Sequence, residues 1–86
     1  VDLPSHEFKS EKTIIKVSEF EVKIVLSLMN KPKRIELYNI QGELLVTFNH
    51  FDETVYIDRK DLKASIYFIK FDYYDNSFIT RKLLLE

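Results

Sequence analysis

The sequence predicts an all-β fold of sandwich type with about seven short strands. Three observations support this: apolar and polar residues alternate over short runs, turn-forming residues separate these runs at roughly 8 to 12 residues, and no run of ten or more residues has a helical period. A chain of 86 residues has room for one hydrophobic core. We therefore expect one domain over residues 1–86, with residues 1–12 as a linker or irregular lead-in from a larger protein.

The first half of the chain contains two predicted strands and a turn. Weak alternation predicts a strand over residues 13–17. The clearest alternation covers residues 20–28 and predicts one buried face, made of Phe20, Val22, Ile24, Leu26 and Leu28. Pro32 fixes its own backbone and disfavours the helical region for the residue before it, so residues 30–33 are expected to form a turn.

The middle of the chain predicts three more strands. Residues 34–40 and 43–48 alternate on either side of Gly42, which is expected to have a positive φ in a hairpin turn. Residues 54–58 are rich in β-branched and aromatic side chains and predict a short strand. Residues 59–64 are too few for a stable helix and are interpreted as a connection.

The last part of the chain predicts a hairpin. Residues 65–73 carry apolar groups on both faces, which indicates a central strand, and residues 78–84 return as the last strand after a turn with Asn76 in the left-handed conformation. An unpaired apolar end would fray, so we expect residues 83–85 to pair in a sheet. Aromatic side chains around this hairpin are expected to serve core packing and cross-strand pairing. They are Phe71, Tyr73, Tyr74 and Phe78.

Composition excludes several classes of function. The chain has 13 basic and 14 acidic residues, and a net charge of −1 favours neither nucleic acid nor an anionic membrane as a partner. It has no cysteine, which excludes disulfides, thiolate chemistry and cysteine-based zinc sites. No apolar run approaches the ~20 residues of a membrane-spanning helix, so no direct membrane insertion is expected.

The polar residues do not predict an active site. His6 and His50 lie far apart in the sequence, and a catalytic or metal role needs converging partners. The spacing of Asp52, Glu53 and Asp58 matches no calcium-binding loop. No serine has a nucleophile-elbow context. We therefore expect no catalytic residues, no metal and no cofactor, and a protein that is not an enzyme.

From Lys33 onward the motifs follow a specific order. Residues 34–45 contain a hydrophobic-x-hydrophobic-Tyr-Asn run with Gly42 after it, and residues 55–58 precede an Asp-Leu pair. An Ile-Tyr pair and a final Arg-Lys-Leu run follow. This order resembles the type A C-terminal sorting domains of the type IX secretion system of Bacteroidetes. The matching positions are Tyr38, Gly42, Leu62, Ile66, Tyr67, Arg81, Lys82 and Leu83.

The resemblance implies an Ig-like sandwich that acts by recognition. Such domains end secreted proteins and are recognised by an outer-membrane translocon once the attached N-terminal cargo has reached the periplasm. A sortase removes the domain in most members, and the cargo reaches the cell surface or the medium. The family signal concentrates in the last strand, so the resemblance implies that Arg81, Lys82 and Leu83 contact the machinery. The remaining motif positions are expected to be structural.

The sequence is also compatible with one alternative function. The chain also fits an accessory Ig-like domain that spaces or stabilises a larger surface protein, or one that binds carbohydrate through exposed rings. Deleting residues 81–86 is expected to abolish export under the sorting hypothesis and only to lower stability under the alternative.

Overall fold

The structure, a computed structural model, describes residues 13–27 and 30–86. The expected lead-in at residues 1–12, which includes His6, and the predicted strand position Leu28 lie outside the described residues. The described residues form seven strands and no helix, which confirms the all-β prediction. The strands are β1 (Ile14–Val17), β2 (Glu21–Val25), β3 (Arg34–Tyr38), β4 (Leu44–Phe48), β5 (Thr54–Asp58), β6 (Ser65–Asp72) and β7 (Phe78–Leu85).

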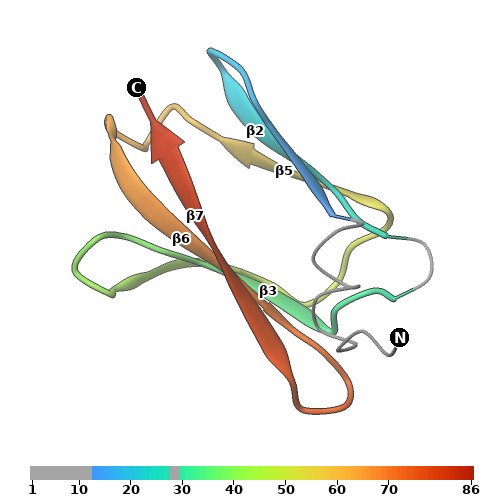
Figure 1. The fold of residues 1–86 in the computed structure, drawn as a ribbon. Coiled ribbons are helices and arrows are strands. Elements are labelled where there is room, and N and C mark those ends of the chain that lie inside the picture. Colours follow the sequence, from blue (N-terminus) through green and yellow to red (C-terminus); the bar gives the residue numbers. More distant parts are fainter. Residues whose placement is uncertain (1–12, 28–29) are drawn as a thin grey trace, which may run out of the picture.

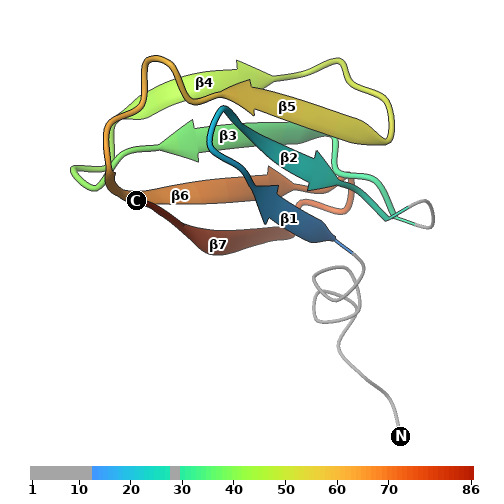
Figure 2. The same ribbon diagram turned by 90° about the horizontal axis from the view of Figure 1, so that it is seen from above.

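The strands form two antiparallel sheets that pack face to face. The smaller sheet has the order β1-β2-β5 and the larger sheet has the order β4-β3-β6-β7. In Figure 2, the smaller sheet lies in front of the larger one, with β5 toward the β4 side and β1 toward the β7 side. The four edge strands are therefore β1 and β5 in one sheet and β4 and β7 in the other. Figure 1 shows β7 running along the outside of β6.

The core lies between the sheets and follows the predicted period of two. Every second residue of β2, β3 and β5 is buried, because neighbouring side chains along a strand point to opposite faces. The strand β6 lies between β3 and β7, which confirms its predicted central position. The buried apolar residues are Val22, Ile24, Leu26, Ile35, Leu37, Val55, Ile57, Tyr67, Ile69, Phe71, Tyr73, Leu83 and Leu85.

Both predicted left-handed turn residues are confirmed. Gly42 has a φ of 86° and Asn76 a φ of 69°. In the first turn, the Asn39 Oδ1 atom accepts hydrogen bonds from the backbone N–H groups of Gln41 (3.0 Å) and Glu43 (2.9 Å). These bonds end β3 at Tyr38, two residues before the predicted end of that strand.

The prediction that Phe20 faces the core is wrong. Its side chain is 76% exposed and lies in the turn before β2. The Ser18 N–H donates to the Glu21 carbonyl (2.9 Å), and the Glu21 N–H donates to the Ser18 hydroxyl (3.1 Å). These contacts close a tight turn and carry Phe20 out of the strand.

The aromatic residues of the last hairpin divide into two groups. Phe71 and Tyr73 are buried in the core, as expected, whereas Tyr74 is 78% exposed at the tip of the turn. Phe78 is exposed on the outer face of β7, where the Lys70 ammonium lies 4.7 Å from the centre of its ring. This cation–π contact, in place of core burial, accounts for Phe78.

Candidate functional site

The last strand, β7, is the longest edge in the described part of the chain. It spans eight residues and pairs with β6 from end to end without a register shift. The other three edges are four or five residues long, and β4 also has an irregularity where it meets β3. Short or bulged edges resist pairing with other chains, and β7 has neither protection.

The backbone of β7 alternates between bonding to β6 and facing outward. The Tyr73 N–H donates to the Ser77 carbonyl (2.9 Å) at the turn, while the Asp72 carbonyl accepts from the Lys33 N–H (2.7 Å) on the β3 side. Since hydrogen-bonded and non-hydrogen-bonded pairs alternate in an antiparallel ladder, every second residue of β7 turns its N–H and C=O away from β6. Those outward-facing residues are Phe78, Thr80, Lys82 and Leu84.

Of the three residues expected to contact the machinery, two point inward. The Leu83 side chain is 3% exposed and lies opposite Tyr67 in the core. Arg81 is half-buried, and its guanidinium donates to the carbonyl of Thr13 (2.7 Å), just before β1. Arg81 thus ties the edge of the larger sheet to the start of the smaller one.

Lys82 is the one of the three whose side chain is exposed. It lies on the outer face of the larger sheet, opposite Phe68, which in turn lies opposite Tyr38. Leu84, on the same face and opposite Ile66, is also exposed. Lys82 therefore lies at the end of a row that contains the aromatic residues Tyr38 and Phe68, and beside the apolar pair of Ile66 and Leu84.

The motif residues expected to be structural occupy core, turn and outer-face positions. Tyr67 is buried and its hydroxyl donates to the Lys63 carbonyl (2.8 Å). Leu62 packs against the core, and its N–H donates to the Arg59 carbonyl (3.0 Å), which closes a turn over residues 59–62 within the predicted connection. Ile66 and Tyr38 face outward from β6 and β3.

Two further features concern the Tyr38 phenol and the turn that contains Gly42. The pKa of the Tyr38 phenol is raised, first by partial burial and then by its hydrogen bond to Glu36. The turn that contains Gly42 lies beside a hollow of about 520 Å³, which is lined on its other side by Leu62 and Tyr67. The structure thus brings three motif elements together at one end of the sandwich.

Sequence reasoning missed Arg59. One guanidinium nitrogen of Arg59 donates to the Ser18 carbonyl (2.5 Å), and the other donates to the backbone oxygen of Glu86 (2.7 Å). Arg59 therefore holds the end of β7 against the turn between β1 and β2. Nothing local in the sequence marks this role, because its partners lie 41 and 27 residues away.

Within residues 13–27 and 30–86, no three His, Cys, Asp or Glu side chains cluster as metal ligands. The same part of the chain has no helix that is long and apolar enough to cross a membrane. Among these residues, the outer face of the larger sheet and its β7 edge offer a partner unpaired strand backbone, the exposed Lys82 side chain and apolar surface.

Comparison with known proteins gives one family. No curated protein matches the sequence. The sequence profile of the secretion system C-terminal sorting domain matches residues 7–86, nearly the whole chain. The profile covers every described strand, and the motif positions on β3, β6 and β7 fall within it. The chain therefore belongs to the family of secretion system C-terminal sorting domains, which carry the sorting signal of type IX secretion.

Proposed function

We propose that the secretion machinery recognises this domain by adding one of its own strands to the free edge of β7. An attached N-terminal cargo then follows the domain from the periplasm across the outer membrane. The family implies interaction with the machinery, attachment to a cargo and export to the surface or the medium. The partners we propose are the outer-membrane translocon, which reads the edge, and the sortase that acts afterwards.

The observation that carries this proposal is the regularity of β7. Eight consecutive residues are in register with β6, and by the ladder alternation four of them turn their backbone groups away from β6, to a side where no described strand pairs with β7. Backbone pairing along an exposed edge is a general mode of peptide recognition, in which main-chain hydrogen bonds supply affinity. A partner strand would extend the larger sheet from four strands to five.

The three residues of the last motif have distinct roles in the proposed complex. Lys82 presents both its side chain and its backbone to the partner. The buried side chain of Leu83 and the inward-facing side chain of Arg81 hold β7 straight against the core and against Thr13. Their contribution to recognition is to fix the edge.

Export of a reporter tests the proposal. Residues 1–86 are fused to a periplasmic reporter in a bacterium with type IX secretion, and reporter at the surface and in the medium is measured. Thr80→Pro removes an outward-facing N–H of β7 and leaves the β6 ladder unbroken, because proline is tolerated where an edge N–H faces solvent. We expect this variant to stay folded and to lose at least about tenfold in export, since proline blocks strand addition at the centre of the edge.

Thr54→Pro on β5 is the matched control. The Leu26 N–H donates to the Glu53 carbonyl (2.8 Å), so by the same alternation the Thr54 N–H faces away from β2. The control makes the same substitution on an edge of the smaller sheet, and we expect normal export. Normal export of Thr80→Pro, or equal loss in both variants, would contradict recognition at β7.

A hollow at the opposite end of the sandwich from Gly42 supports carbohydrate binding as a second candidate. It has a volume of about 660 Å³, and its lining includes the exposed ring of Tyr74 together with Asn49 and Lys33. An exposed ring beside amide and ammonium donors suits a sugar. Glycan binding that is lost in Tyr74→Ala, with export intact, would support this second function.

A further inference from the structure

The outer face of the larger sheet is divided into an apolar half and a charged half. The registers of β4, β3, β6 and β7 align Leu44, Tyr38, Phe68 and Lys82 in one row across the sheet. Ile66 and Leu84 form the neighbouring pair toward the end of β7. No strand among residues 13–27 and 30–86 covers this face.

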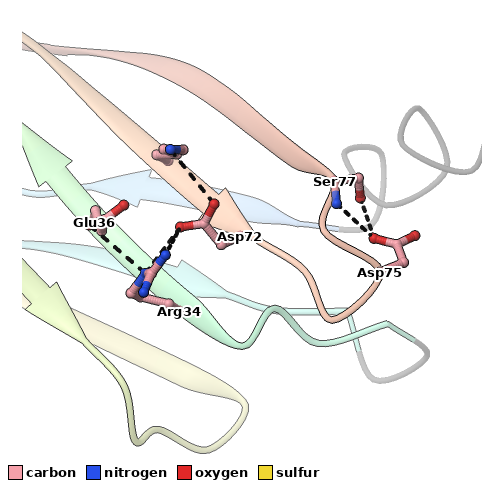
Figure 3. A network of polar contacts seen from close by, with 6 residues as sticks. Arg34, Glu36, Asp72, Asp75 and Ser77 are labelled. Atoms are coloured by element: carbon pink, nitrogen blue, oxygen red, sulfur yellow. Dashed lines mark hydrogen bonds and ion pairs between the residues drawn. The ribbon is translucent and has the colours of Figure 1, made fainter.

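The charged side chains of the charged half form ion pairs with one another. The Arg34 Nη2 atom lies 3.1 Å from Asp72 Oδ2, and the Arg34 Nε atom lies 3.9 Å from Glu36 Oε2. The Lys70 Nζ atom lies 3.8 Å from Asp72 Oδ1. Figure 3 shows the Arg34 side chain between those of Glu36 and Asp72 on adjacent strands. Two cations and two carboxylates therefore balance, and this half has no net charge to offer a partner.

Lys82 forms no ion pair with any of the described residues. Its cross-strand neighbour is Phe68, and its neighbours along β7 on the same face are Thr80 and Leu84. Among the described residues, no carboxylate lies within ion-pair distance of Lys82, and its side chain is exposed. The outer edge of β7 thus presents one unpaired positive charge beside apolar surface.

We propose that the strand added to β7 carries a carboxylate opposite Lys82 and an apolar residue opposite Leu84. This inference rests on the proposed function, because it describes the partner that the β7 edge selects. A strand added to an edge brings its side chains within about 5 Å of those directly opposite. A carboxylate there meets the unpaired ammonium, while an apolar side chain extends the Ile66–Leu84 contact. A basic residue at that position would meet like charge.

The division of the face makes this readout selective. Backbone pairing alone accepts many sequences, whereas side chains on alternate positions distinguish them. The charged side chains in the half that contains Arg34 and Asp72 already form ion pairs with one another. A charged residue on the partner strand therefore strengthens binding at one position only, opposite Lys82. Leu84 restricts the next outward-facing position to an apolar residue.

Substitutions of Lys82 in the same reporter fusion test the proposal. Lys82→Arg keeps the charge and should leave export within about twofold of the parent. Lys82→Gln removes the charge, and Lys82→Glu reverses it. Since an opposite-charge cross-strand pair favours pairing and a like-charge pair opposes it, we expect a loss of a few-fold for Gln and of about tenfold for Glu. Lys16→Glu, an exposed lysine on β1, is the matched control and should export normally.

Leu84→Lys tests the apolar position in the same assay and should also lower export. Thermal unfolding of each purified fusion shows whether the domain remains folded. The outcomes separate this inference from the proposed function. Normal export of Lys82→Glu, or equal losses for Gln and Glu, while Thr80→Pro is blocked, would overturn the carboxylate partner and leave strand addition standing. Normal export of Thr80→Pro would overturn strand addition itself.

Discussion

The substitution Leu83→Ala tests whether β7 is anchored as the structure describes. The Leu83 side chain is 3% exposed, and truncating a buried leucine lowers the free energy of unfolding by about 2–5 kcal/mol. For a domain of this size, each kcal/mol lowers the unfolding midpoint by roughly 4–8 °C. A loss of about 3 kcal/mol therefore predicts a midpoint lower by roughly 12–24 °C.

Leu84→Ala is the internal control for this measurement. Leu84 is the next residue of the same strand, yet its side chain is 54% exposed on the outer face. Its truncation should cost less than about 1 kcal/mol, because little apolar surface is buried there. Both variants are measured by urea and thermal unfolding with circular dichroism. Equal losses, or a larger loss for Leu84→Ala, would refute the register of β7 with β6 and with it the assignment of Lys82 to the outer face.

Three further predictions concern the turns and the ties between the sheets. Gly42→Ala should lower the free energy of unfolding in urea by about 1–2 kcal/mol from its φ of 86° alone, since no atom lies within 4 Å of the added methyl. Arg81→Ala should lower the free energy of unfolding by about 1–3 kcal/mol, because it removes a charged donor to the Thr13 carbonyl. Amide exchange should accelerate more in β1 than in β3 when the variant is compared with the parent. Burial, and then Asp75, raises the pKa of Tyr73 above 10.0, so the unfolded state loses that proton first. Stability should therefore be unaffected by Tyr73 below pH 10 and fall above it, a decline that Tyr73→Phe should reduce.

The same magnitudes explain why deleting residues 81–86 cannot separate sorting from folding. The deletion removes both Leu83 and Leu85 from the core. At about 3 kcal/mol each, the loss approaches the whole stability of a small domain, which is on the order of 4–13 kcal/mol for 86 residues. Loss of export would then follow from unfolding under either hypothesis. Point substitutions on the outward-facing positions of β7 avoid this difficulty.

The strands were predictable from the sequence because a two-layer sandwich imposes a period of two. Each sheet buries one face, so Val22, Ile24, Ile35 and Leu37 recur at alternate positions. The prediction failed at Phe20 because an alternating pattern does not reveal where a strand begins. The start of β2 is set by the hydrogen bond from the Glu21 N–H to the Ser18 hydroxyl. A serine without a neighbouring glycine or proline only weakly predicts a turn.

The candidate site was predictable only in part. The resemblance located the last strand, and alternation along it separates the inward Leu83 from the outward Lys82. The role of Arg81 was not accessible in this way, since its partner Thr13 lies 68 residues away in the sequence. Local patterns report which face a residue lies on, whereas contacts between the sheets depend on how the strands are ordered.

A long free edge is a hazard for any soluble protein, and Lys82 offers an explanation of how this domain tolerates one. Two copies that pair through β7 about a twofold axis at Lys82 would bring their ammonium groups face to face in an antiparallel ladder. The same charge that opposes this self-pairing favours a partner strand with a carboxylate at that position. In the proposed complex, a single exposed lysine on an otherwise uncharged edge would therefore act in both directions, against a second copy and for an acidic partner. A neutral residue at position 82 would neither oppose pairing with a second copy nor favour an acidic partner.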